Sequence, residues 1–134
     1  MSRELFWLSL TLAATALFWF PYVLNRIVVR GLLGTLANPS PNDVPLAPWA
    51  ERARCAHTNA VENLVLFAPA IIAVHVLNIG NSTTAFASEL YFISRTAHYV
   101  VYTLGIVALR TLAFFCGWVG TALILYRLLE AVPV

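Results

Sequence analysis

Stretches without any charged residue constrain this chain more than any other feature of its sequence. Residues 5–24 contain no Asp, Glu, Lys or Arg. Twenty residues is about the length that a helix needs to cross a hydrocarbon core of roughly 30 Å. Residues 64–79 form a second charge-free stretch. We therefore expect an integral membrane protein with several membrane-spanning helices. Membrane lipid is then one of its expected partners.

The composition supports this interpretation and excludes other classes. The 134 residues are 60% hydrophobic and 10% charged, whereas an ordinary soluble domain is about 45–50% apolar and about 25% charged. A soluble monomer and a disordered chain are both excluded by these values. The net charge of +2 is too small and too scattered for a nucleic-acid partner. Two cysteines cannot build a disulfide framework.

The apolar blocks and the breaks between them predict an all-α, four-helix, up-down bundle in a single domain, 1–134. The expected helices cover residues 4–36, 49–78, 84–109 and 111–131. Residues 38–45 have the composition of a loop, and Gly80 begins a tight break. Pro21 is expected to kink the first helix without ending it. A cleaved signal peptide is the alternative for the N-terminal stretch, but the apolar run continues past the small residues 14–16.

Arginine placement predicts the orientation of the bundle. Arg3 and Arg127 are the only arginines expected at the end that holds both termini. Because positive charge concentrates on the cytoplasmic side, both termini should lie outside and the opposite end in the cytoplasm. The membrane would be the cell inner membrane if the protein is bacterial. Five arginines flank the opposite end: Arg26, Arg30, Arg52, Arg54 and Arg110.

Two expected helices carry polar side chains at a spacing of three and four, which puts each set on one helix face. At a rise of about 1.5 Å per residue, Glu62 lies about 20 Å from Trp49 and Arg95 about 21 Å from Leu109, the helix ends expected on the cytoplasmic side. Because a buried charge is costly alone in a bilayer, we expect these two side chains to pair. The first set is Arg52, Cys55, Asn59 and Glu62, and the second is Tyr91, Arg95, His98 and Tyr102.

Each of these residues also has a structural interpretation. The Glu62–Arg95 pair could have the purely structural role of fixing the register of two helices. Asn59 and His98 could form hydrogen bonds that hold these helices together. Tyr102 could be an anchor at the membrane interface. The functional interpretation is a path of arginines, a carboxylate, an amide and a tyrosine that suits a small polyanionic ligand.

Other chemistries have less support. The three histidines have no partner at metal-ligand spacing, so no metal site is expected. Cys55 could be a reactive thiol, because Arg52 and Arg54 lie close in sequence and favour a thiolate. A packing role is the alternative for Cys55.

Longer segments resemble a known family. Residues 51–64, ERARCAHTNAVENL, closely resemble the second-helix signature of the membrane-associated proteins in eicosanoid and glutathione metabolism, the MAPEG family. Residues 95–102, RTAHYVVY, resemble its third-helix signature and are followed by Gly105 and Arg110-Thr111. Residues 37–39, Ala-Asn-Pro, match its first loop. Within this family, the chain resembles a bacterial-type member similar to microsomal glutathione transferases.

The resemblance implies a homotrimer that binds glutathione as co-substrate between neighbouring subunits, in the half of the membrane that faces the cytoplasm. Arg110 would be catalytic by stabilising the glutathione thiolate, with Thr111 as a neighbouring hydroxyl. His98 occupies a position that varies in the family. The positions implied to bind glutathione are Arg30, Asn59, Glu62, Arg95 and Tyr102.

Cys55 is a departure from the family pattern, because many members have an arginine there. Two functions therefore remain open. One is a glutathione-dependent transferase or peroxidase that acts on lipophilic electrophiles through an activated thiolate. The other is a non-catalytic membrane protein that keeps the scaffold for a structural or ligand-binding role. The loss of an arginine at Cys55 favours the second, and Arg110 favours the first.

Overall fold

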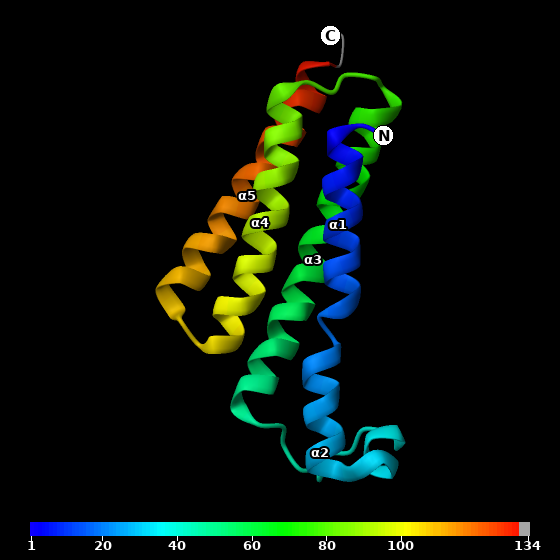
Figure 1. The fold of residues 1–134 in the computed structure, drawn as a ribbon, viewed down its shortest axis with the longest axis vertical. Helices are drawn as coiled ribbons and strands as arrows, with labels where there is room; N and C mark the ends of the chain where they lie inside the picture. The colour runs from blue at the N-terminus through cyan, green and yellow to red at the C-terminus, as the bar shows by residue number, and fades with distance from the viewer. Residues whose placement is uncertain (132–134) are drawn as a thin grey trace.

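The computed structural model describes residues 1–131, and every regular element in that range is an α-helix, as expected. Figure 1 shows the helices side by side in one bundle. The expected range 4–36 corresponds to two of these helices and each other expected range to one; the turn expected at residue 110 lies about five residues earlier in the chain. The helices are α1 (Arg3–Leu17), α2 (Phe20–Leu36), α3 (Pro48–Val76), α4 (Ser82–Leu104) and α5 (Val107–Glu130).

The helices run up and down, as predicted. The N-terminus, the turn from α3 to α4 and the end of α5 lie at one end of the bundle, and the 37–47 loop lies at the other (Figure 1). At this second end, Gly105 closes α4 with φ +81°, a left-handed conformation that glycine adopts without strain. The arginine-rich end is therefore opposite the end that holds the N-terminus and the end of α5.

The first expected helix, 4–36, is kinked near Pro21, where Phe18 and Trp19 keep helical backbone angles between α1 and α2. α1 ends at Leu17, and α2 starts at Phe20 with Pro21 in its first turn. Proline lacks the N–H that would continue the helical hydrogen bonds across this point. The Tyr99 hydroxyl of α4 donates to the Phe18 carbonyl oxygen (2.8 Å), and the two rings stack with centroids 3.9 Å apart. A contact from another helix thus stabilises the kink.

Small residues bring the helices close together. On α3, the buried face is a seam of alanines at helical spacing, Ala50, Ala53, Ala56 and Ala60. On α5, Gly120 lies so close to α4 that an added Cβ would be 2.8 Å from the Ala87 carbonyl oxygen. Membrane helices associate through such small residues, because lipid provides no hydrophobic drive for packing.

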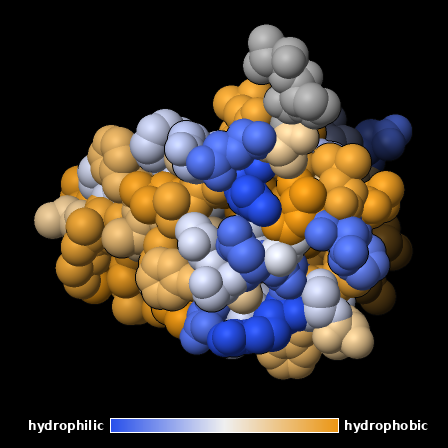
Figure 2. All heavy atoms as spheres, turned by 90° about the horizontal axis from the view of Figure 1, so that it is seen from above, coloured by the Kyte–Doolittle hydropathy of each residue, from blue (hydrophilic) through white to orange (hydrophobic). Residues whose placement is uncertain are grey.

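Three helical stretches are long and apolar enough to cross a membrane: α1 with α2 as Arg3–Leu36, α3, and α5. α4 has sufficient length, at 23 residues, but Glu89, Arg95 and His98 lower its hydropathy. Arg95 and His98 are buried within the bundle, so that α4 turns polar side chains toward other helices. On the end face that holds the N-terminus, hydrophilic residues form a band between hydrophobic flanks (Figure 2).

Candidate functional site

Arg95 is the centre of a polar cluster between α3 and α4. Its guanidinium donates to the Asn63 side-chain oxygen (2.7 Å) and to the Asn59 side-chain oxygen (3.3 Å). Asn63 in turn donates to the Asn59 carbonyl oxygen (2.8 Å). Arg95 is 3% exposed, so a full positive charge lies inside the bundle with two neutral amides as its hydrogen-bonding partners.

Aromatic rings and a glycine complete the surroundings of Arg95. Its guanidinium carbon lies 5.3 Å from the centre of the Tyr91 ring and 5.0 Å from that of Phe114, distances typical of cation–π contacts. A Cβ on Gly117 would be 2.8 Å from Arg95 Nε, so only glycine lets the side chain lie against α5. Arg95 Nε is buried without a hydrogen-bond partner among residues 1–131.

The predicted Glu62–Arg95 pair is wrong for the single chain. Glu62 is exposed on the outside of α3, and none of the four ion pairs among the described residues contains Glu62 or Arg95. The rotation of α3 explains the difference. The alanine seam that includes Ala56 and Ala60 packs inward, which turns Asn59 and Asn63 toward α4 and leaves Glu62 outside.

A small cleft of about 180 Å³ lies between α4 and α5, next to this cluster. Phe114 connects the two, because its ring contacts Arg95 on one side and forms part of the cleft wall on the other. The apolar wall is open at the bundle surface, where a lipophilic molecule could approach. Four residues predicted for the site line the cleft with Phe114: His98, Tyr102, Arg110 and Thr111.

Arg110 lies at the mouth of this cleft with its charge unpaired. Its guanidinium carbon is 4.5 Å from the centre of the Tyr102 ring. No ion pair within residues 1–131 includes Arg110, and its side chain makes no hydrogen bond there. The His98 ring meets Tyr102 edge-on, with centroids 5.5 Å apart. The ring of Tyr102 thus holds a guanidinium whose N–H groups remain available to an anion.

Arg52 has a structural contact that the sequence did not predict. Its Nε donates to the Thr103 carbonyl oxygen (3.0 Å) near the end of α4. A Cβ on Gly105 would be 3.3 Å from this nitrogen. Because the last carbonyl groups of a helix lack intrahelical donors, Arg52 caps the C-terminus of α4.

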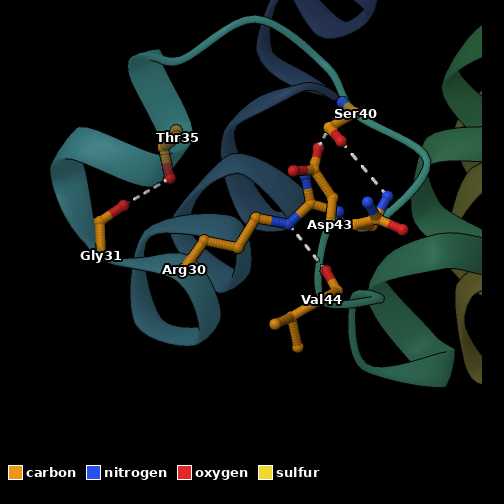
Figure 3. Close-up of polar contacts among 7 residues, drawn as sticks. Arg30, Gly31, Thr35, Ser40, Asp43 and Val44 are labelled. Atoms are coloured by element: carbon orange, nitrogen blue, oxygen red, sulfur yellow. Dashed lines mark hydrogen bonds and ion pairs between the residues drawn. The ribbon is translucent and has the colours of Figure 1, made fainter.

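Arg30 is engaged in the 37–47 loop, as Figure 3 shows. Its guanidinium forms an ion pair with Asp43 (2.8 Å) and donates through Nε to the Val44 carbonyl oxygen (2.7 Å). The next residue, Gly31, has φ +72° and bends α2 at this point. Within a single chain, Arg30 is thus directed to the loop and is not among the residues that line the cleft.

Two further predicted residues, Cys55 and Thr111, make no contact with Arg95 or Arg110 among the hydrogen bonds and ion pairs of residues 1–131. Cys55 is half-buried on α3 and has a free thiol. Thr111 is exposed, and its hydroxyl donates to the Val107 carbonyl oxygen (3.2 Å). The sequence prediction missed Phe114, and it also missed Asn63, although Asn63 lies in the quoted 51–64 segment. Its spacing of four from Asn59 is the signal that could have identified it.

Comparison with protein-family models supports the resemblance that the sequence suggested. Residues 5–129 match the model described as the MAPEG family. Comparison with curated proteins and with solved structures gives no match. The matched range covers α2, α3, α4 and nearly all of α1 and α5, including the Arg95 cluster and the cleft. The chain therefore belongs to the MAPEG family, the membrane-associated proteins in eicosanoid and glutathione metabolism.

Proposed function

We propose that the protein is a membrane-bound, glutathione-dependent transferase or peroxidase that acts on lipophilic electrophiles at the cleft between α4 and α5. The observation that carries this proposal is the pair of uncompensated cations at one site. Arg95 and Arg110 have no carboxylate partner among residues 1–131, and Phe114 contacts Arg95 and lines the cleft beside Arg110.

Two cations without counter-ions favour an anionic ligand. A buried charge is stabilised when an opposite charge and hydrogen bonds replace its hydration. Glutathione carries carboxylates and, when ionised, a thiolate, so it would supply the missing negative charge. Arginine forks suit carboxylates because their donors match the geometry of the two oxygens. Asn59 and Asn63 would offer amide groups to the peptide part of the ligand.

Arg110 is the residue proposed to activate the thiol. The pKa of an ordinary thiol is about 8.5, and a neighbouring positive charge lowers it by stabilising the thiolate. In transfer, the thiolate sulfur would attack an electrophilic carbon and form a C–S bond. The electron pair of the bond that breaks leaves with the leaving group, or takes up a proton if the reaction is an addition. The electrophile would reach the cleft from the lipid phase.

The position of Glu62 is evidence for assembly into a homo-oligomer. We propose that this oligomer is the trimer implied by the family. Glu62 lies fourteen residues from Pro48 and fourteen from Val76, so it is about 21 Å from either end of α3. It is exposed in the single chain. A carboxylate facing hydrocarbon at that depth is costly. A second subunit that covers this face would shelter Glu62 and bring it to a shared glutathione site.

Ultraviolet difference absorption of the purified protein with glutathione tests this function directly. We expect a thiolate band in the wild type at neutral pH and its loss in Arg110→Ala. Arg127→Ala is the matched control, because Arg127 is on the same helix but at the other end, where it contacts the Ile79 carbonyl oxygen and Glu130. This control should keep the band.

Conjugation of a test electrophile provides the second measurement. Arg110→Ala should lower the rate at least tenfold at neutral pH, with a smaller loss at high pH, where the thiol ionises without help. A wild type with neither a thiolate band nor thiol-dependent turnover at saturating glutathione would favour the non-catalytic alternative. An active wild type matched by Arg110→Ala would assign thiol activation to another residue.

A further inference from the structure

A cavity lies far from the proposed thiol site, at the end of the bundle that holds the N-terminus. Its volume is about 410 Å³, which lies in the range of small-molecule sites. It is bounded by the start of α1, the end of α3 and the turn into α4. Figure 2 looks onto this end, where hydrophilic side chains gather at the centre.

A buried carboxylate contributes to the wall of this cavity. Glu4 is 6% exposed, and its Oε1 accepts a hydrogen bond from the hydroxyl of Thr84 (2.6 Å), a side chain that is itself fully buried. A Cβ on Gly80 would be 2.9 Å from the same oxygen, so the absence of a side chain there makes room for the carboxylate. The second oxygen, Oε2, accepts no hydrogen bond from any residue in 1–131.

Glu4 also lacks a counter-ion. None of the four ion pairs among residues 1–131 includes it, and its neighbour Arg3 is directed to Glu89 (3.6 Å). A carboxylate inside a bundle is stabilised when a positively charged group faces it, and one hydroxyl and the first turn of α1 supply only part of that stabilisation. A cation in the cavity would supply what is missing.

The surrounding groups indicate which cation fits. Within residues 1–131, no group of three or more His, Cys, Asp and Glu side chains could hold a metal ion. An ammonium group instead needs about three acceptors for its N–H donors. Besides Glu4, the wall contains the side chains of His75, Asn78 and Ser82. It also contains Ser2 and Asn81, whose side-chain oxygens already accept the backbone N–H groups of Leu5 and Thr84 and have one lone pair left.

We propose that this cavity binds a primary ammonium group, with Glu4 as its counter-ion. The start of α1 and the α3–α4 turn lie at the polar end of the bundle, where lipid headgroups are expected. A zwitterionic phosphoethanolamine headgroup could place its ammonium at Glu4 and its phosphate near Arg3, which is also in the wall. The second possible source is a soluble amine, which carries the same ammonium group but is not part of a membrane lipid.

Thermal unfolding of the detergent-solubilised and the nanodisc-embedded protein distinguishes these two sources. The probes are ethanolamine against choline in detergent, and phosphatidylethanolamine against phosphatidylcholine in nanodiscs. Choline and its lipid carry no N–H donors, so only the ethanolamine member of each pair should raise Tm, by about 3 °C or more. A rise with the lipid alone identifies a headgroup site, and a rise with free ethanolamine identifies a site for soluble amines.

Glu4→Gln should abolish the selectivity for ethanolamine, because it removes the charge but keeps an oxygen for Thr84. Glu89→Gln is the matched control, since Glu89 is also a carboxylate near Arg3 but does not line the cavity. Gly80→Ala is a second variant, which pushes the carboxylate aside if Glu4→Gln fails to fold. Equal Tm with ethanolamine and choline in the wild type, in both settings, would overturn the proposal. So would a selectivity that persists in Glu4→Gln or Gly80→Ala.

The test is independent of the proposed glutathione chemistry. Glu4 and Arg110 lie at opposite ends of the bundle (Figure 1). Glu4→Gln should therefore leave the thiolate band unchanged while it removes ammonium selectivity.

Discussion

The guanidinium carbon of Arg110 lies 4.5 Å from the centre of the Tyr102 ring, across the turn that joins α4 to α5. This contact orients a cation whose N–H groups have no protein acceptor among residues 1–131. Gly105 makes this contact possible. Its left-handed conformation ends α4, so that α5 turns back and runs alongside α4. The ring and the turn together place Arg110 at the cleft.

The first prediction concerns the ring of Tyr102. If the cation–π contact positions Arg110, Tyr102→Phe should keep thiolate formation and Tyr102→Leu should reduce it. A contact of this kind contributes about 0.5–2 kcal/mol, so the thiol affinity should fall between about twofold and thirtyfold in Tyr102→Leu. The measurement is the thiolate band as a function of glutathione concentration. A loss in Tyr102→Phe as large as in Tyr102→Leu would instead assign the effect to the hydroxyl.

The second prediction concerns the partners of Arg95. Asn63→Leu removes the shorter of its two hydrogen bonds and should lower the free energy of unfolding by about 1.5–3 kcal/mol, the usual contribution of a hydrogen bond to a charged group. Unfolding in detergent measures this loss. Glu62→Gln is the comparison, and it should change the stability of the isolated subunit little. If Glu62→Gln lowered the free energy of unfolding more than Asn63→Leu, the result would support a Glu62–Arg95 ion pair.

The third prediction concerns Glu62 in the assembled protein. Because Glu62 is exposed at mid-helix in the single chain, its role should appear in the oligomer and in ligand binding. We expect Glu62→Gln to weaken glutathione binding at least tenfold while helix content stays the same. Calorimetry gives the affinity, and native mass spectrometry gives the number of subunits. Unchanged affinity together with an unchanged assembly would leave Glu62 without the proposed role.

The fourth prediction concerns Cys55, which stands where many family members have an arginine. Cys55→Arg should add a carboxylate-binding fork on α3 and tighten glutathione binding at least tenfold, since a charge-assisted hydrogen bond contributes about 1.5–3 kcal/mol. Cys55→Lys is the matched control, because a lysine adds the charge without the fork. Equal gains in both variants would indicate an effect of charge alone.

The fifth prediction concerns orientation in the membrane. In a background with both native cysteines replaced by alanine, Ser82→Cys should react with an impermeant thiol reagent from outside, and Asn42→Cys only from inside. These positions lie at opposite ends of the bundle, at the start of α4 and in the 37–47 loop. The reverse labelling pattern would place the arginine-rich end outside.

Residue composition and spacing predicted the helical segments and the polar faces of α3 and α4, whereas the family resemblance supplied the site roles of Arg30, Arg110 and Thr111. The charge-free stretches 5–24 and 64–79 predict α1 and the second part of α3, because a membrane requires apolar side chains over a fixed length. The periodicity of α4 predicts that Tyr91, Arg95 and His98 share a face, and all three are buried. These predictions depend on local rules, which act within one helix.

Contacts between helices decided what the sequence alone left open. Glu62 and Asn63 follow Asn59 by three and four residues, so both are compatible with its face of α3. Which of them meets Arg95 depends on the rotation of α3, and the packing of its alanine seam sets that rotation. Likewise, Pro21 predicts the kink, but only the folded structure brings the Tyr99 hydroxyl, 81 residues away in sequence, to the Phe18 carbonyl oxygen beside it.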